Sequence, residues 1–183
     1  MIKDKKTLKL YMDADKKALG MHFKKPRIFR DEIWRYEIIL RKLEYYINNN
    51  TFISIFLKKY YEYKIHNLEK KYHFYIKPNV CDMGLSLGHI GPIIINDYAK
   101  IGKNCRIHVG VNIGATPNNP NDAPIIGDNV YIGPGAKIYG KIRIGNNVAI
   151  GANSVVNKDI PDNVTVAGVP AKIVSYKGNT RRM

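Results

Sequence analysis

The sequence has few of the residues that build disulfide-rich or metal-stabilised proteins, and it has no long apolar run. Two cysteines, Cys81 and Cys105, occur among 183 residues, and neither belongs to a Cys-x-x-Cys pair. This argues against a disulfide scaffold and against a zinc site. The longest apolar stretch, near Thr51–Leu57, is far too short to cross a bilayer.

The N-terminus lacks the apolar segment that follows the positive charges of a secretory signal. Residues 1–6 carry charge with no apolar core behind them, so the sequence predicts a cytoplasmic protein. Hydrophobic residues make up 45% of the chain, which is enough for a folded core and argues against general disorder.

Acidic residues are also scarce: 30 Lys and Arg face 15 Asp and Glu, a net charge of +15 at pH 7. The excess is concentrated in residues 1–80, which hold 19 basic and 9 acidic residues. No DNA-binding signature accompanies it, so nucleic acid is not an expected partner. A solvated helix surface explains the charge. The second interpretation is attraction to anionic partners such as the CoA phosphates, a nucleotide sugar or a nearby membrane surface.

The first part of the chain has the apolar spacing of helices. Apolar residues recur at helical intervals in residues 3–20, about 28–47 and about 51–72. The third segment is rich in tyrosine, and its aromatic stripe is typical of core or subunit contacts. The sequence therefore predicts an α-helical N-terminal domain over residues 1–74.

From about residue 76 the apolar period changes to six. Ile or Val stands at positions 95, 101, 107 and 113, and then at 126, 132, 138, 144, 150 and 156. A small or β-branched residue stands four positions after most of these anchors, and Cys105 is one of them. Three such hexads close one triangular coil, and the anchors of successive coils stack inward. The sequence predicts a mainly β fold here, a single-stranded left-handed parallel β-helix over residues 75–174.

The six-residue period is interrupted once. Between Ile113 and Ile126 the spacing is one residue longer than two hexads, and residues 115–124 are rich in Asn and Pro. We expect this segment to be extruded from its coil as a loop, a common location for functional residues. Residues 175–183 form a basic tail.

Three stretches resemble the hexapeptide-repeat acyltransferase superfamily: Leu87–Asn96, Ile132–Ile138 and Ala167–Lys172. With the Ala14-Asp15 pair in the helical part, they are similar to the serine acetyltransferase-like branch, which includes many sugar O-acetyltransferases of bacterial polysaccharide synthesis. The resemblance implies an acetyl-CoA-dependent O-acetyltransferase that needs no metal. It also implies a homotrimer with acetyl-CoA between neighbouring β-helices, and it leaves a dimer of trimers open.

A histidine suits the chemistry, because the acceptor hydroxyl loses its proton as it attacks the thioester. The resemblance implies that His89, in a Gly-His-x-Gly turn, is the catalytic base. His108 should point outward in the same part of the stack, as a groove-lining residue or a second polar contact. Tyr75 stands where the family places the acid that orients the base, so Asp82 or a backbone carbonyl is the expected substitute. The remaining histidines, expected at the surface, are His22, His66 and His73.

For the donor, the resemblance implies small or flat residues that let the pantetheine arm lie close to the backbone. Pro134 and Ala152 are one coil apart and should stack on one edge of the prism. Lys172, with Arg181 or Arg182, is the expected contact of the CoA phosphates, although simple solvation explains these basic residues equally well. The donor-binding set is Gly114, Ala115, Thr116, Pro134, Ala152 and Lys172.

The acceptor contacts of serine acetyltransferases do not carry over. Gly88 replaces the acid before the catalytic histidine, and Asp122-Ala123 replaces an Arg-His pair. A zwitterionic amino acid needs charged partners, so the sequence favours a carbohydrate acceptor in a cell-surface polysaccharide or its precursor. Serine O-acetylation for cysteine biosynthesis, a non-catalytic trimeric scaffold and N-acetylation of an amino sugar stay open as alternatives.

Overall fold

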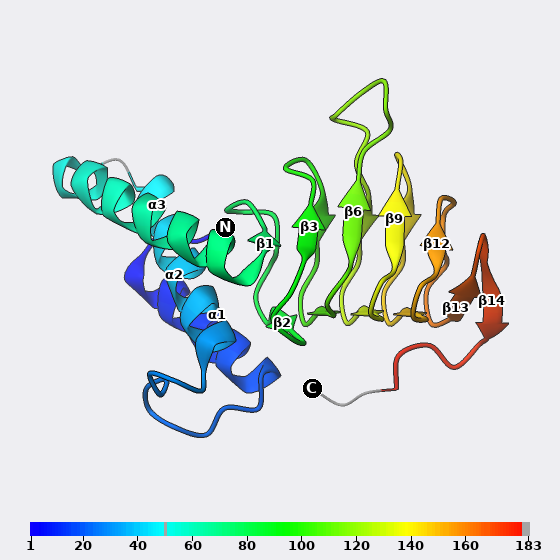
Figure 1. Ribbon diagram of the computed structural model, residues 1–183, viewed down its shortest axis with the longest axis horizontal. Coiled ribbons are helices and arrows are strands. Elements are labelled where there is room, and N and C mark those ends of the chain that lie inside the picture. Colours follow the sequence, from blue (N-terminus) through cyan, green and yellow to red (C-terminus); the bar gives the residue numbers. More distant parts are fainter. Residues whose placement is uncertain (50, 181–183) are drawn as a thin grey trace.

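A computed structural model gives the fold and describes residues 1–49 and 51–180 (Figure 1). Three helices lie at one end of the molecule, and short strands wind away from them into a prism of coils. The helices are α1 (Lys5–Ala18), α2 (Glu32–Ile47) and α3 (Phe52–Tyr72). The strands are β1 (Phe74–Tyr75), β2 (Ser86–Leu87), β3 (Ile93–Ile95), β4 (Lys100–Ile101), β5 (Arg106–Ile107), β6 (Asn112–Gly114), β7 (Ile125–Ile126), β8 (Tyr131–Ile132), β9 (Lys137–Tyr139), β10 (Arg143–Ile144), β11 (Ala149–Ile150), β12 (Val155–Val156), β13 (Thr165–Gly168) and β14 (Ala171–Ser175).

Local capping explains where the helices begin. The Asp4 carboxylate accepts the backbone N–H of Thr7 at 2.7 Å and caps α1. Thr51 and Ser54 form a reciprocal capping box at the start of α3. Helix α2 begins four residues later than the sequence spacing suggests, because residues 27–31 form a turn instead. An Arg27–Asp31 ion pair of 2.8 Å closes that turn.

The strands form the three faces of a parallel β-helix, as the six-residue period predicts. One face is a sheet in the order β1-β3-β6-β9-β12, the second is β4-β7-β10, and the third is β2-β5-β8-β11-β13-β14. Neighbouring strands pair in parallel with their anchor residues in register, for example Ile107 with Ile132. The last pair, β13 and β14, is antiparallel and ends the stack.

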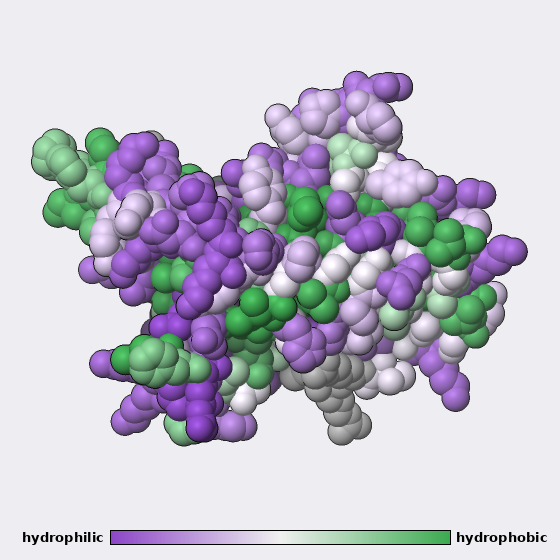
Figure 2. Space-filling model, in the orientation of Figure 1, coloured by the Kyte–Doolittle hydropathy of each residue, from purple (hydrophilic) through white to green (hydrophobic). Residues whose placement is uncertain are grey.

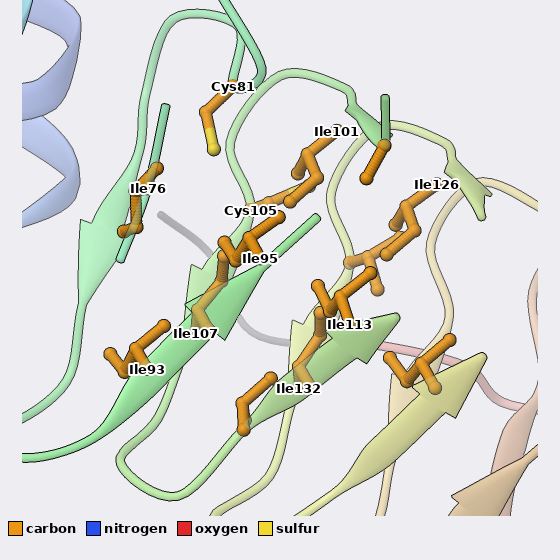
Figure 3. Close-up of a cluster of buried hydrophobic side chains, with 14 of the residues drawn as sticks. Ile76, Cys81, Ile93, Ile95, Ile101, Cys105, Ile107, Ile113, Ile126 and Ile132 are labelled. Carbon is orange, nitrogen blue, oxygen red and sulfur yellow. The ribbon is translucent and has the colours of Figure 1, made fainter. Parts of the chain in front are cut away.

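The anchors point into the prism and form its core, as the close-up of Ile95, Ile113, Ile107 and Ile132 shows (Figure 3). Each of these side chains is fully buried. Burying one such side chain contributes about 2 kcal/mol, so the stacked anchors dominate the stability of this domain. The expected small residues fill the corners, and Cys105 is buried there with a free thiol.

A ladder of asparagine side chains runs along the edge where the second face meets the third. Asn104, Asn129, Asn147 and Asn163 all have positive φ between 55° and 60°, which asparagine adopts more readily than most residues. Their amides bond from coil to coil at 3.2, 3.0 and 2.9 Å. The ladder fixes the tight turns that the hexad pattern requires at this edge.

Residues 115–124 leave the prism between β6 and β7 and rise above it (Figure 1). The loop is tied to its base by a hydrogen bond from Thr116 N–H to the Asp122 carbonyl and by an ion pair between Asp122 and Lys141. Among the described residues, no helix is both long enough and apolar enough to cross a membrane.

Apolar side chains also gather outside the core, at the far end of α3 (Figure 2). They occupy most of one exposed helical turn: Phe52, Ile53, Ile55 and Phe56. The aromatic stripe expected on this helix is therefore largely exposed within a single chain.

Candidate active site

His89 lies two residues after strand β2, and this strand has a coil on one side only. Successive backbone N–H groups along this strand point in opposite directions. Those of Ser86 and Gly88 bond to carbonyls of the next coil at 3.0 and 2.8 Å. The N–H groups that face the other way, at Leu85 and Leu87, have no preceding coil to pair with. Carboxyl groups of the helices accept them instead: Asp15 accepts the N–H of Leu85 at 2.9 Å, and Glu37 accepts the N–H of Leu87 at 3.1 Å.

A buried arginine braces this arrangement. Arg41 has no solvent exposure and donates to Asp15 at 2.7 Å and to Glu44 at 3.0 Å. It also donates to the backbone carbonyls of Cys81 and Asp82, both at 2.7 Å. The helices thus cap the first coil with buried charges and fix the strand that leads to His89. The sequence reasoning noted Asp15 but missed Arg41, although a cation among the apolar positions of α2 is a signal for such a cap.

A cavity of about 410 Å³ opens beside His89, between the beginning of α2 and the first coil. Its wall carries charges of both signs, with Arg30 and Arg106 as cations and Asp31 and Glu32 as anions. Sequence reasoning missed all four, because they lie outside the motifs that carry the resemblance. These four residues come together only because the helices pack against the first coil.

The two acids of the cavity differ in their surroundings. Asp31 is buried and accepts the Arg27 side chain and backbone N–H, and these hydrogen bonds lower its pKa to about 2. Asp31 is therefore a charged structural group at neutral pH. Glu32 is partly exposed in the first turn of α2, where a carboxylate also faces the positive end of the helix dipole.

His108 lies against His89, as the outward direction of its strand position predicts. The two ring centroids are 5.8 Å apart, and the ring of Tyr131 lies 5.1 Å from His108 on the other side. His108 Nε2 accepts a hydrogen bond from Arg106 at 3.2 Å. This side of the prism therefore has a cluster of two histidines and an arginine, of which His89 and Arg106 line the cavity.

Neither Tyr75, at the family's position for the orienting acid, nor Asp82, its suggested substitute, lines the cavity of His89. Tyr75 is in β1 on another face, under the ammonium group of Lys77 at 4.7 Å. Asp82 lines a separate cavity with Tyr11, whose pKa burial and Asp82 raise. The structure therefore places Asp82 in a different cavity from His89.

The expected donor-binding residues fall on two edges of the prism. Pro134 and Ala152 follow strands of the third face, as His89 does, so these three residues lie along one edge. His89 and Ala152 are three coils apart, about 15 Å at the usual strand spacing. Gly114 ends β6 on the first face, and Ala115 and Thr116 continue from it into the loop.

Lys172 is exposed in β14, where its register partner is Ala167 at the far end of the third face. The expected alternatives for phosphate contact, Arg181 and Arg182, lie outside the described residues. Within one chain, the residues at the loop entrance and those along the His89 edge are thus separated by the width of a face.

Comparison with known proteins identifies the repeat and the fold. The family model "Bacterial transferase hexapeptide (six repeats)" matches residues 123–158. A serine acetyltransferase from Buchnera aphidicola is 44% identical over 101 residues, 54% of this chain and 39% of that protein. The chain spans about two fifths of the length of the curated relatives it matches.

Solved structures cover more of the chain. A serine acetyltransferase from Brucella abortus in complex with coenzyme A has a TM-score of 0.74 and 27% identity, covering 95% of this chain and 70% of that one. A serine acetyltransferase from Neisseria gonorrhoeae in complex with serine has a TM-score of 0.67 and 28% identity, covering 93% and 70%. Both likenesses extend through the helices as well as the coils.

These relatives contradict the expectation of a carbohydrate acceptor, because the similar proteins are serine acetyltransferases. The physical reason for the error is visible in the cavity beside His89. The sequence argument counted charges at the family's own positions, Gly88 and Asp122-Ala123, and found them missing. Charges of both signs reach the cavity from other positions, so it is not the neutral cleft that a sugar was expected to need.

The hexapeptide match lies within the coils, and the solved structures share the order of three helices followed by a β-helix. Residues 123–158 thus match the hexapeptide transferase family, and the chain is similar in sequence and in fold to serine acetyltransferases.

Proposed function

We propose that this protein is a serine O-acetyltransferase that transfers acetyl from acetyl-CoA to the hydroxyl of L-serine. The observation that carries the proposal is the cavity beside His89, which combines a candidate base with charges of both signs. A zwitterion needs an anionic partner for its ammonium group and a cationic partner for its carboxylate. The serine complex of the relative from Neisseria gonorrhoeae supports the same acceptor class.

The reaction requires one base and a fixed orientation of the serine hydroxyl toward the thioester. His89 takes the proton of the serine hydroxyl as the oxygen attacks the thioester carbonyl. The tetrahedral intermediate collapses with loss of the CoA thiolate, which takes a proton from the imidazolium. Because the ring is exposed at the cavity mouth, His89 can face both substrates.

Acetyl-CoA is the proposed donor, and the coenzyme A complex of the relative from Brucella abortus supports it. The His89 edge, with Pro134 and Ala152, would hold the extended pantetheine arm, and Lys172 would meet the phosphates. The loop-entrance residues Gly114, Ala115 and Thr116 lie on another edge, so a shared ligand needs two chains. We propose a homotrimer for this reason, since threefold symmetry places unlike edges of neighbouring chains together. The proposed place of action is the cytoplasm.

The test measures release of the CoA thiol from acetyl-CoA with L-serine as acceptor. Removing a general base costs about 100- to 10,000-fold in rate, so His89→Ala should lower kcat by that amount. His66→Ala is the matched control, because His66 is an exposed histidine on α3 away from the cavity. A wild-type enzyme that binds acetyl-CoA but does not acetylate L-serine would overturn the proposal.

A further inference from the structure

The solvent-facing side of the first turn of α3 is apolar. Phe52, Ile53, Ile55 and Phe56, which we call the α3 tip, are 76%, 68%, 59% and 63% exposed, and the polar side chain among them, Ser54, is buried. The Phe52 and Phe56 rings touch edge to face with centroids 5.3 Å apart. The tip lies at the end of α3 that projects away from the coils (Figure 1). A contiguous exposed patch of this kind marks contact with a protein or with a membrane.

The exposed residues that follow the tip along α3 are basic or carry a polar hydroxyl. In the next two turns they are Lys59, Tyr60, Tyr63 and Lys64. Tyrosine and lysine are typical of the headgroup level of a bilayer. A tyrosine ring has an apolar body and a polar end, and a lysine reaches the phosphates along an apolar stem. The order of side chains along the helix therefore matches the layers of a bilayer surface, from acyl chains to headgroups.

The charge around the tip is complementary to an anionic lipid surface. Helix α3 holds five lysines and two glutamates. Lys58 and Lys59 share Glu62 at 3.9 and 3.2 Å, but these ion pairs are exposed and therefore weak, and the helix keeps a net positive charge. The helix dipole adds positive potential at the same end, where the Thr51 capping box already satisfies backbone donors. Acidic headgroups are attracted to such a surface.

The tip fits a protein partner less well. A stable protein interface takes about 20–30 residues from each side, whereas the tip offers four apolar side chains on little more than one helical turn, about 5.4 Å of helix. A second copy of this chain that met the first through the tip would also bring the lysines of two α3 helices together. A lipid surface needs no matching shape and supplies the opposite charge.

We propose that the α3 tip is an interfacial anchor that binds this protein reversibly to bilayers containing anionic lipid. The four tip side chains enter the boundary between headgroups and acyl chains, and the lysines of the following turns lie at the phosphates. This role goes beyond the proposed function, which needs neither the tip nor a lipid. No tip residue lines the cavity beside His89, so either proposal can fail without the other.

The test is sedimentation of the full chain with vesicles of phosphatidylcholine alone and with vesicles that also contain about 30% phosphatidylserine. The wild type should bind the anionic vesicles at least about 10-fold more tightly, and added salt should weaken this binding. Burying one phenylalanine ring is worth a factor of about 10 in affinity. Phe52→Ser/Phe56→Ser should therefore weaken binding to the anionic vesicles about 100-fold.

The matched control is Val174→Ser/Tyr176→Ser. These two side chains are 62% and 82% exposed, in and just after β14 at the opposite end of the molecule. The control should bind anionic vesicles as the wild type does. A wild type that does not sediment with anionic vesicles, or a tip variant that binds them as tightly as the control, overturns the proposal. Sedimentation velocity without lipid tests the other occupant: a smaller assembly for the tip variant than for the wild type would assign the tip to contact between copies and also overturn the lipid anchor.

Discussion

Replacing Arg41 with methionine would remove the cation that joins the helices to the first coil. The methionine side chain keeps much of the volume but has no donors, so it isolates the effect of the hydrogen bonds. Arg41 donates to two carboxylates, Asp15 and Glu44, and to two backbone carbonyls. Both carboxylates are 1% exposed, so water cannot replace the lost partner.

The expected loss follows from this burial. Removing one partner of a buried ion pair costs about 3–5 kcal/mol, because the remaining charge stays buried without compensation. We expect a loss of about 4 kcal/mol in the free energy of unfolding. For a chain of this length, that corresponds to a drop in Tm of about 10 °C.

Thermal and urea unfolding at one protein concentration would measure the change, because the proposed oligomerisation would make both transitions concentration-dependent. Lys9→Met is the control: it removes an exposed i,i+4 pair with Asp13 and should cost under about 0.5 kcal/mol. A loss of less than about 1 kcal/mol for Arg41→Met would refute the view that this buried cluster fastens the coils to the helices.

Two further changes probe the same region. Glu37→Gln keeps an acceptor for Leu87 N–H and removes a carboxyl whose pKa burial raises. The stability associated with that carboxyl is fully present below its unfolded pKa of about 4.3 and is lost as pH rises through the folded value. Urea midpoints should therefore fall between pH 5 and pH 8 more in the wild type than in Glu37→Gln, and equal falls would contradict this. Gly88→Ala would press its Cβ against His108, and such overpacking costs about 1–3 kcal/mol. Adding His108→Ala should recover most of that loss, and unfolding midpoints that show no recovery would refute the close contact.

The β-helix could be predicted from the sequence because its signal is periodic. Each inward residue, such as Ile107 or Ile132, repeats the same environment, so one physical rule accounts for every coil. The outward direction of His108 followed from the same rule. The beginning of α2 could not be predicted in this way, because an Arg27–Asp31 ion pair, and no apolar spacing, keeps residues 27–31 out of the helix.

The candidate site could be predicted only in part. His89 was proposed from its motif, and the shared edge of Pro134 and Ala152 followed from the length of one coil. Arg106 and Glu32 were missed, because they are far apart in sequence and meet only where the helices dock on the first coil. The sequence comparison considered only the positions where the family carries its acceptor-binding charges, and these charges are missing here. The folded chain brings charged residues from other positions to the cavity.

The helical cap and the cavity beside His89 are consequences of the same structural problem. A β-helix leaves the backbone N–H groups of its first strand without partners, and buried groups of this kind are costly. Asp15 and Glu37 accept those N–H groups, which requires the helices to lie across the strand that leads to His89. The docked helices then form one wall of the cavity, and the coils form the other. The proposed donor edge depends on the repeat alone, whereas the cavity beside His89 depends on the contact between helices and coils. Substitutions at the beginning of α2 should therefore change the proposed acceptor site while the repeats preserve the proposed donor edge.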